Sequence, residues 1–170
     1  SGAGKIQSNE SVSVKIPKGV DDGTRIRIAG KGEAGSKGGA SGDLYLFISV
    51  EPHNIFKRSE ENLYYELPIS FTDAALGATV EVPSIDGGKT KIKIPSGTQS
   101  GKQLRLKGKG MPVLKRNIFG DLYIRIVTEV PTSLTKRQKE LLNEFKTLED
   151  NKSNPLIKSF FDKAKKFWKN

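Results

Sequence analysis

The sequence predicts a mainly β protein, with two tandem β-sandwich-like domains of related topology, the first of them truncated, followed by C-terminal α-helices. Three observations predict this fold class. A set of motifs recurs at a fixed spacing, several short segments alternate apolar and polar residues, and the end of the chain places apolar residues at helical spacing. Alternation with period two is typical of half-buried strands, whereas spacings of three and four residues are typical of amphipathic helices.

The repeated motifs reveal a duplication. The pattern K-I-P-x-G-x-x-x-G-x-x-x-R-x-x-G-K-G begins at Lys15 and again at Lys93, and G-D-L-Y ends the two copies at Tyr45 and Tyr123, always with an offset of 78. Chance does not keep one register over so long a stretch. Residues 63–82 precede the second copy, and their counterpart would fall largely before the first residue. We therefore expect an incomplete first domain at 1–62, a second domain at 63–131 and a helical segment at 132–170.

The individual strands and turns follow from local patterns. Gly87 and Gly88 after Asp86 predict a hairpin turn, and residues 72–76, which end at Gly77, predict one helical turn. The longer apolar runs at 44–50 and 122–130 predict the better-buried strands. The remaining predicted strands are short and alternate in polarity, and they cover residues 12–16, 25–28, 80–82, 91–94 and 103–106.

Two helices are predicted near the end of the chain. Thr135 and Gln138 have the spacing of a capping box, and Asn154 followed by Pro155 is typical of an N-cap and a first helical position. The apolar faces carry more large aromatic residues than a free tail exposes, so we expect oligomerisation or docking there, with a membrane surface as a weaker alternative. The residues of these faces include Leu141, Leu142, Phe145, Leu148, Leu156, Ile157, Phe160, Phe161, Phe167 and Trp168.

Composition excludes several classes of site. The 170 residues include no cysteine and one histidine, His53, which excludes a disulfide scaffold, a zinc finger within the chain and a Cys–His nucleophile pair. Residues 30–35 match G-x-G-x-x-G, but a loop sequence follows where a dinucleotide site needs a helix. Gly88-Lys-Thr90 lacks the glycine that a phosphate loop requires at position 83, which is proline. We therefore expect no enzyme activity.

The charge balance leaves a second function open. The chain has 29 Lys and Arg against 19 Asp and Glu, a net charge of +10, and residues 151–170 hold six lysines against the single acid Asp162. A basic β protein that binds nucleic acid is therefore the alternative interpretation. Aromatic and basic residues are interleaved only at 56–58 and at Tyr64-Tyr65, which disfavours nucleic acid as a partner.

Taken in order and spacing, these motifs resemble the C-terminal region of the DnaJ co-chaperones, over nearly the whole chain. Ser1-Gly-Ala-Gly4 also resembles the tail of the last zinc-binding repeat of that family. The motifs that carry the resemblance include Val14-Lys-Ile-Pro-x-Gly19, Gly42-Asp-Leu-Tyr45, His53-x-x-Phe56-x-Arg58, Leu63-Tyr64, Ile69-Ser-Phe71, Ala74-Ala-Leu-Gly77, Pro83-x-x-Asp86-Gly87 and Gly120-Asp-Leu122.

The resemblance implies a cytoplasmic chaperone module that binds unfolded polypeptides and delivers them to a DnaK-type ATP-dependent chaperone. It implies a homodimer, no membrane partner and no cofactor within this chain, because the zinc region and the J domain of the family lie upstream of the matched part. The binding mode it implies is the addition of a client strand beside an apolar groove.

The resemblance also assigns site residues. Val12 and Phe56 match members of the peptide pocket, and Val14 and Ile16 are their neighbours on the same strand face. The expected dimerisation residues are Leu141, Leu142, Phe145, Phe160, Phe161, Phe167 and Trp168.

Overall fold

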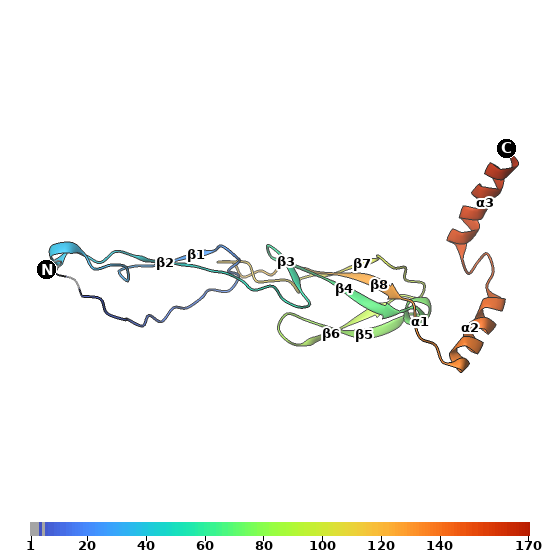
Figure 1. Cartoon of the computed structure of the whole chain (residues 1–170), viewed down its shortest axis with the longest axis horizontal. Helices are drawn as coiled ribbons and strands as arrows, with labels where there is room; N and C mark the ends of the chain where they lie inside the picture. The colour runs from blue at the N-terminus through green and yellow to red at the C-terminus, as the bar shows by residue number, and fades with distance from the viewer. Residues whose placement is uncertain (1–3, 5) are drawn as a thin grey trace. The chain divides into compact units, whose positions relative to one another are not determined.

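The computed structural model describes residue 4 and residues 6–170, and it forms two compact units that divide between Glu129 and Val130 (Figure 1). The resemblance of residues 1–3 to a zinc-repeat tail lies outside the described residues. The first unit contains β1 (Arg25–Ile28), a 3₁₀ turn (Ser36–Gly38), β2 (Leu44–Phe47), β3 (Lys57–Ser59), β4 (Asn62–Ser70), α1 (Phe71–Leu76), β5 (Ala78–Pro83), β6 (Lys89–Ile94), β7 (Gln103–Leu106) and β8 (Leu122–Glu129), and the C-terminal unit contains α2 (Lys136–Leu148) and α3 (Pro155–Lys169). The predicted fold class is confirmed, whereas the finer boundary at residues 62 and 63 stays a prediction.

The core of the first unit lies between two sheets. One sheet has the order β3-β4-β8-β7, in which β4 and β8 are parallel and the other neighbours are antiparallel, and the other is the antiparallel pair β5-β6. In β4, β5, β6, β7 and β8, most of the inward-pointing alternate residues are apolar, which gives the sandwich-like core that the sequence pattern predicts. The core consists of Phe56, Leu63, Tyr65, Ile69, Ala74, Val82, Ile92, Ile94, Leu122, Ile124 and Ile126.

The hairpin β1-β2 repeats the geometry of β7-β8. Ile28 pairs with Leu44 in the first hairpin, and Leu106 pairs with Leu122 in the second, so the register agrees at the sequence offset of 78. The backbone bonds beyond the strands agree as well: the N–H of Gly23 donates to Ile48 O, and the N–H of Gly101 donates to Ile126 O. The predicted duplication is therefore confirmed by two equivalent hairpins.

One aspartate closes the loop after the first strand of each hairpin. Asp121 accepts hydrogen bonds from Gly108 N at 2.9 Å and from Arg105 Nε at 2.7 Å, and Asp43 accepts the equivalent pair in the first hairpin. Gly108 has a φ of +74°, where a side chain would be strained. The hydrogen bond from Gly108 and then the Arg105 guanidinium lower the pKa of Asp121 below its ordinary value of 3.8.

This lowered pKa predicts a loss of stability in acid. A carboxyl whose pKa is lower in the folded chain stabilises the fold above its ordinary pKa, and that contribution disappears as the pH falls through the folded value. We therefore expect Asp121→Asn to narrow the difference in free energy of unfolding between about pH 6 and about pH 3, as measured by urea titration. An equal loss of unfolding free energy in the parent chain and in the variant would contradict the assignment of this pH dependence to Asp121.

The segment predicted as a strand at 12–16 is not a strand, because within the described residues no backbone hydrogen bond joins it to a neighbouring segment. Its equivalent at residues 90–94 belongs to β6 and pairs with β5. The prediction for 44–50 is also partly wrong. β2 ends at Phe47 and its inward residues are only half-buried, whereas Leu122 of β8 is fully buried.

Other local predictions are confirmed. α1 begins after Ser70, whose hydroxyl accepts from Asp73 N, and ends at Gly77, which has a φ of +81°. The turn after β5 is held by Asp86, whose carboxylate accepts from Ser84 Oγ at 2.6 Å and Gly88 N at 2.8 Å. These turns depend on residues that are close in sequence, which explains why the sequence pattern alone indicates them.

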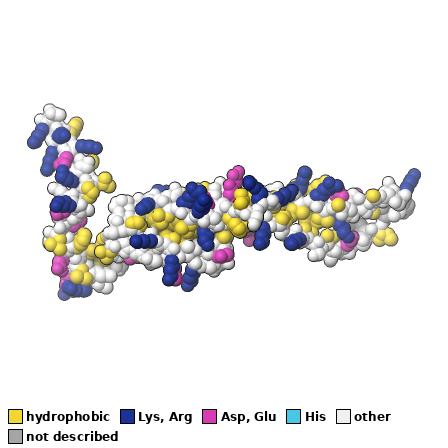
Figure 2. Space-filling model, turned by 180° about the vertical axis from the view of Figure 1, so that it is seen from behind, with side chains coloured by type: hydrophobic (Ala, Val, Ile, Leu, Met, Phe, Trp, Pro, Cys, Tyr) yellow, Lys and Arg dark blue, Asp and Glu magenta, His cyan; other side chains and the backbone are white. Residues whose placement is uncertain are grey.

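The C-terminal unit consists of two amphipathic helices. Thr135 and Gln138 form both bonds of the predicted capping box at the start of α2. Asn154 occupies the predicted N-cap of α3, but its side chain makes no capping bond and instead donates to Glu149 Oε2 at 2.6 Å. Apolar and basic side chains are both exposed along this unit (Figure 2). Among the described residues, no helix is long and apolar enough to cross a membrane.

Candidate functional site

The segment Val12–Ile16 is an extended stretch that has no strand partner among the residues that the structure describes. Val12 and Val14 are half-buried, and Ile16 is 57 % exposed. Within the described part of the chain, no backbone hydrogen bond joins residues 11–17 to another residue. Backbone N–H and C=O groups in an extended segment of this kind can pair with a further strand. The structure thus brings the three predicted site residues of this segment together beside an open backbone.

Phe56 lies elsewhere, in the core next to the four-stranded sheet. It is 6 % exposed, and its ring makes edge contacts with Tyr65 at 5.3 Å and with His53 at 5.2 Å between centroids. The Tyr65 hydroxyl donates to Pro83 O at 3.2 Å, and burial raises the pKa of Tyr65 to about 12. In this arrangement a bound peptide reaches Phe56 only after a local rearrangement, so Phe56 as a pocket member stays a prediction.

The ring of His53 holds a turn of the backbone. Its Nδ1 accepts hydrogen bonds from the N–H groups of Ile55 at 3.0 Å and Phe56 at 3.3 Å, so the ring closes the turn that leads into β3. No group of three or more His, Cys, Asp or Glu side chains in the described residues could hold a metal ion. These two hydrogen bonds give His53 a structural role that does not require a bound ligand.

Sequence reasoning missed one exposed aromatic surface. Phe47 of β2 is 74 % exposed and Tyr45 is 45 % exposed, with the Arg25 guanidinium 5.2 Å from the Tyr45 ring centroid. In the second hairpin the equivalent of Tyr45 is Tyr123, and Tyr64 of β4 stacks on it at 5.1 Å. The equivalence of the two hairpins could have indicated this surface, because β8 pairs with both β7 and β4, whereas among the described residues β2 pairs with β1 alone.

The predicted dimerisation residues lie on the C-terminal unit and keep their side chains accessible. Phe160 is 64 % exposed and Trp168 is 69 % exposed, and the rings of Phe160 and Phe161 make an edge contact at 5.2 Å. Six of the seven predicted residues are exposed, and the seventh, Leu142, is half-buried. The seven are Leu141, Leu142, Phe145, Phe160, Phe161, Phe167 and Trp168. Two amphipathic helices therefore present apolar faces that nothing covers within the described residues.

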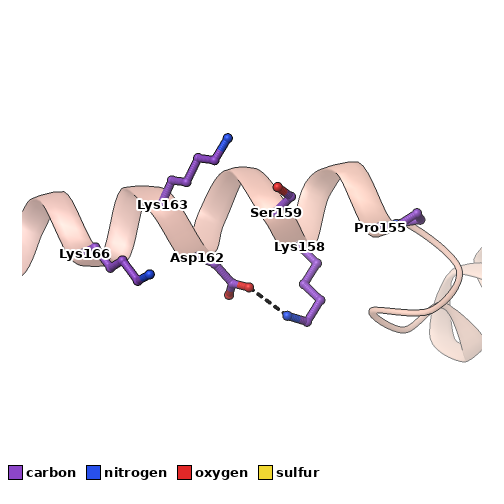
Figure 3. Close-up of a pocket in the computed structure, with 6 residues that line it drawn as sticks. All are labelled: Pro155, Lys158, Ser159, Asp162, Lys163 and Lys166. Carbon is purple, nitrogen blue, oxygen red and sulfur yellow. Dashed lines mark hydrogen bonds and ion pairs between the residues drawn. The ribbon is translucent and has the colours of Figure 1, made fainter.

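A shallow hollow lies on the polar side of α3 (Figure 3). Lys158 Nζ is 2.7 Å from Asp162 Oδ2, and this hydrogen-bonded ion pair lowers the pKa of the Asp162 carboxyl. All the lining residues come from this one helix: Pro155, Lys158, Ser159, Asp162, Lys163 and Lys166. Their charges are exposed, so the arrangement shows no catalytic group in an enclosed pocket.

Over residues 6–170, the geometry defines a class of protein: a duplicated β protein in which the extended segment Val12–Ile16 is unpaired and a helical unit has exposed apolar faces. The model of the DnaJ C terminal domain matches residues 4–131, and that of the chaperone protein DnaJ C-terminal region matches residues 137–170. The chain belongs to the DnaJ C-terminal domain family.

Curated relatives agree with the family match. The chain is similar to the chaperone protein DnaJ of Pelagibacter ubique, with 66 % identity over 169 residues, which cover 99 % of this chain and 45 % of that protein. It is also similar to the chaperone proteins DnaJ of Brucella canis and Brucella suis, each with 53 % identity over 167 residues, 98 % of this chain and 44 % of theirs. The chain thus spans somewhat less than half the length of these relatives.

Proposed function

We propose that this chain binds segments of non-native polypeptide by strand addition at Val12–Ile16, as part of a cytoplasmic co-chaperone that passes its clients to a DnaK-type ATP-dependent chaperone. The observation that carries the proposal is the contrast between this segment and its equivalent. Residues 90–94 have the same alternating pattern and lie in β6, where each of them pairs with a residue of β5, whereas residues 12–16 have no strand partner in the described part of the chain. An unpaired strand segment offers main-chain hydrogen bonds to any extended peptide.

The chemistry of this mode suits clients of unrelated sequence. Main-chain hydrogen bonds do not depend on the client's side chains, and the half-buried Val12 and Val14 favour large apolar side chains beside them. An unfolded chain exposes both backbone groups and apolar side chains, which a folded chain buries. Recognition by this segment would therefore select for the unfolded state itself.

A homodimer would strengthen this binding. Two segments in one assembly turn the second contact with a client into an intramolecular event, which raises the apparent affinity without a new contact. The uncovered apolar faces of α2 and α3 support this part of the proposal, since each buried aromatic side chain contributes about 2 kcal/mol. The exposure of Phe160 and Trp168 is the observation on which it rests.

The structure does not favour the nucleic-acid alternative. Of the aromatic residues that are interleaved with basic ones in the sequence, Phe56 and Tyr65 are buried in the core. Tyr64 stacks on Tyr123, so the facing sides of these two rings are occupied by each other. Binding of bases needs accessible aromatic faces in a positively charged groove.

Strand addition predicts a backbone-dependent affinity. We expect Val14→Asp to weaken the binding of a fluorescein-labelled apolar heptapeptide by about tenfold or more, as measured by fluorescence anisotropy, because a carboxylate would be desolvated beside the client strand. Ser13→Asp is the matched control, since Ser13 is exposed and precedes Val14 on the opposite side of the extended segment.

The peptide backbone provides a second control. A heptapeptide with N-methyl groups at alternate residues keeps its side chains but loses the donors that a ladder needs. It should bind poorly to the parent chain. Equal binding of the methylated and unmethylated peptides would contradict strand addition, and equal binding by the Val14 variant would remove this segment from the site.

A further inference from the structure

Arg58 connects the four-stranded sheet to the turn that follows the unpaired segment. It lies in the middle of β3, opposite Leu63 of β4, and its side chain is only 17 % exposed. Its Nη1 donates to Val20 O at 2.8 Å and its Nη2 to Gly19 O at 3.3 Å. These acceptors are 38 and 39 residues earlier in the chain, in the turn that follows Val12–Ile16.

The orientation of the guanidinium is itself fixed. Its Nε donates to Glu60 O at 2.7 Å, within the turn after β3, and Nη1 lies 3.7 Å from Asp21 Oδ1. One planar group thus spans three backbone carbonyl oxygens and a carboxylate. Lysine could not reproduce this arrangement, because its ammonium is a point charge without the rigid fork of donors.

The same turn is held from a second side. Gly19 has a φ of +91°, and a Cβ at this position would lie 2.6 Å from Leu114 N and 2.7 Å from Pro112 O. Both atoms are backbone atoms of the loop between β7 and β8, so they cannot move aside like the end of a flexible side chain. The turn at residues 17–20 is therefore enclosed between Arg58 and this loop.

The second hairpin shows how the equivalent turn is held. Gly97 is the equivalent of Gly19, and its N–H donates to Ala74 O at 2.9 Å, while Ser96 Oγ donates to Ala75 O at 2.9 Å. That turn is thus anchored to α1 in its own half of the duplication. The turn at residues 17–20 is anchored instead to β3, which pairs with β4 of the second half, and to the loop between β7 and β8.

We propose that Arg58 is a positioning residue that locks the turn at residues 17–20, and through it the first hairpin and the segment Val12–Ile16, in one orientation on the second half of the duplication. The consequence for client binding rests on the proposed function: a client would meet the segment Val12–Ile16 in one fixed orientation. The orientation itself is independent of any client and can be measured directly.

Double electron–electron resonance tests this orientation. The chain contains no cysteine, so spin labels at Ser41→Cys, between β1 and β2, and at Thr79→Cys, on β5, are unique. Both side chains are exposed. With each labelled chain diluted in an excess of unlabelled chain, so that distances between protomers of a dimer do not contribute, we expect one narrow distance distribution in the labelled parent chain and a distribution at least twice as broad in Arg58→Ala and in Arg58→Lys. Failure of the lysine variant to restore the narrow distribution would identify the forked donors, and not the charge, as the cause.

Two further variants keep the test decisive. Gly19→Ala should shift or broaden the distribution, because its Cβ would meet the backbone of Leu114. Arg105→Ala should not, because Arg105 pairs with Asp121 within the second hairpin. Unchanged distributions in folded Arg58→Ala and Gly19→Ala, or equal broadening in Arg105→Ala, would overturn the inference. A parent chain that fails to bind the labelled heptapeptide would refute the proposed function and leave the distance measurement intact.

Discussion

A chain that ends at Asp150 should sediment as a monomer, whereas the full chain should sediment as a dimer at micromolar concentration. The removed part contains α3, whose apolar residues from Leu156 to Trp168 share one side of the helix, with the lysines on the other. Phe160 and Trp168 are more than half exposed. Since burial of one such side chain contributes about 2 kcal/mol, several together account for a stable dimer.

Point variants distinguish the contribution of the apolar face of α3 to dimerisation from that of the opposite face. Replacing Phe160 and Phe167 by alanine should shift the dimer to monomer, with a dissociation constant raised by about a hundredfold or more, because two aromatic contacts per protomer are lost. Replacing Lys158 and Lys166 by alanine changes the opposite face and should leave the sedimentation coefficient unchanged. Sedimentation velocity at several concentrations measures both. A truncated chain that remains dimeric would remove α3 from the interface.

Much of this fold follows from the sequence because the duplication fixes the register. β1 and β7 fall at the predicted residues, and α1 and the turn at Asp86 depend on local chemistry alone. The segment at 12–16 could not be predicted in the same way, because a strand requires a neighbour that its own sequence does not specify. Its alternation is the same as in β6, but β6 pairs with β5, whereas no described strand pairs with residues 12–16.

The candidate site shows the same limit. The family resemblance indicates Val12 and Val14 as site residues, and the alternation of their segment places them on one face. The burial of Phe56, in contrast, depends on Tyr65 and His53, which pack around it only in the folded chain. The contacts of Arg58 are also not indicated by the sequence. Its neighbours in sequence do not indicate that its donors reach Gly19 and Val20, and only the fold brings them together.

The duplication also provides a matched pair of core substitutions, Leu122→Ala and Leu44→Ala. The two leucines have the same register in their hairpins, but Leu122 is fully buried between β4 and β7, whereas Leu44 is half-buried and pairs with β1 alone. We expect Leu122→Ala to lower the free energy of unfolding by about 3 kcal/mol or more. Leu44→Ala should lower it by about 1 kcal/mol, because less apolar surface is lost and solvent fills the space.

Urea unfolding followed by far-ultraviolet circular dichroism measures both variants. The single tryptophan, Trp168, belongs to the C-terminal unit and is unsuitable as a probe of either hairpin. The size of the effect of Leu44→Ala shows whether the edge of β2 is open. A small effect of Leu44→Ala agrees with a β2 edge that is open in solution. A loss as large as that of Leu122→Ala would mean that a further strand covers β2 and takes the place that β4 occupies beside β8, and the exposure of Phe47 and Tyr45 would then belong to an interface and not to a free surface.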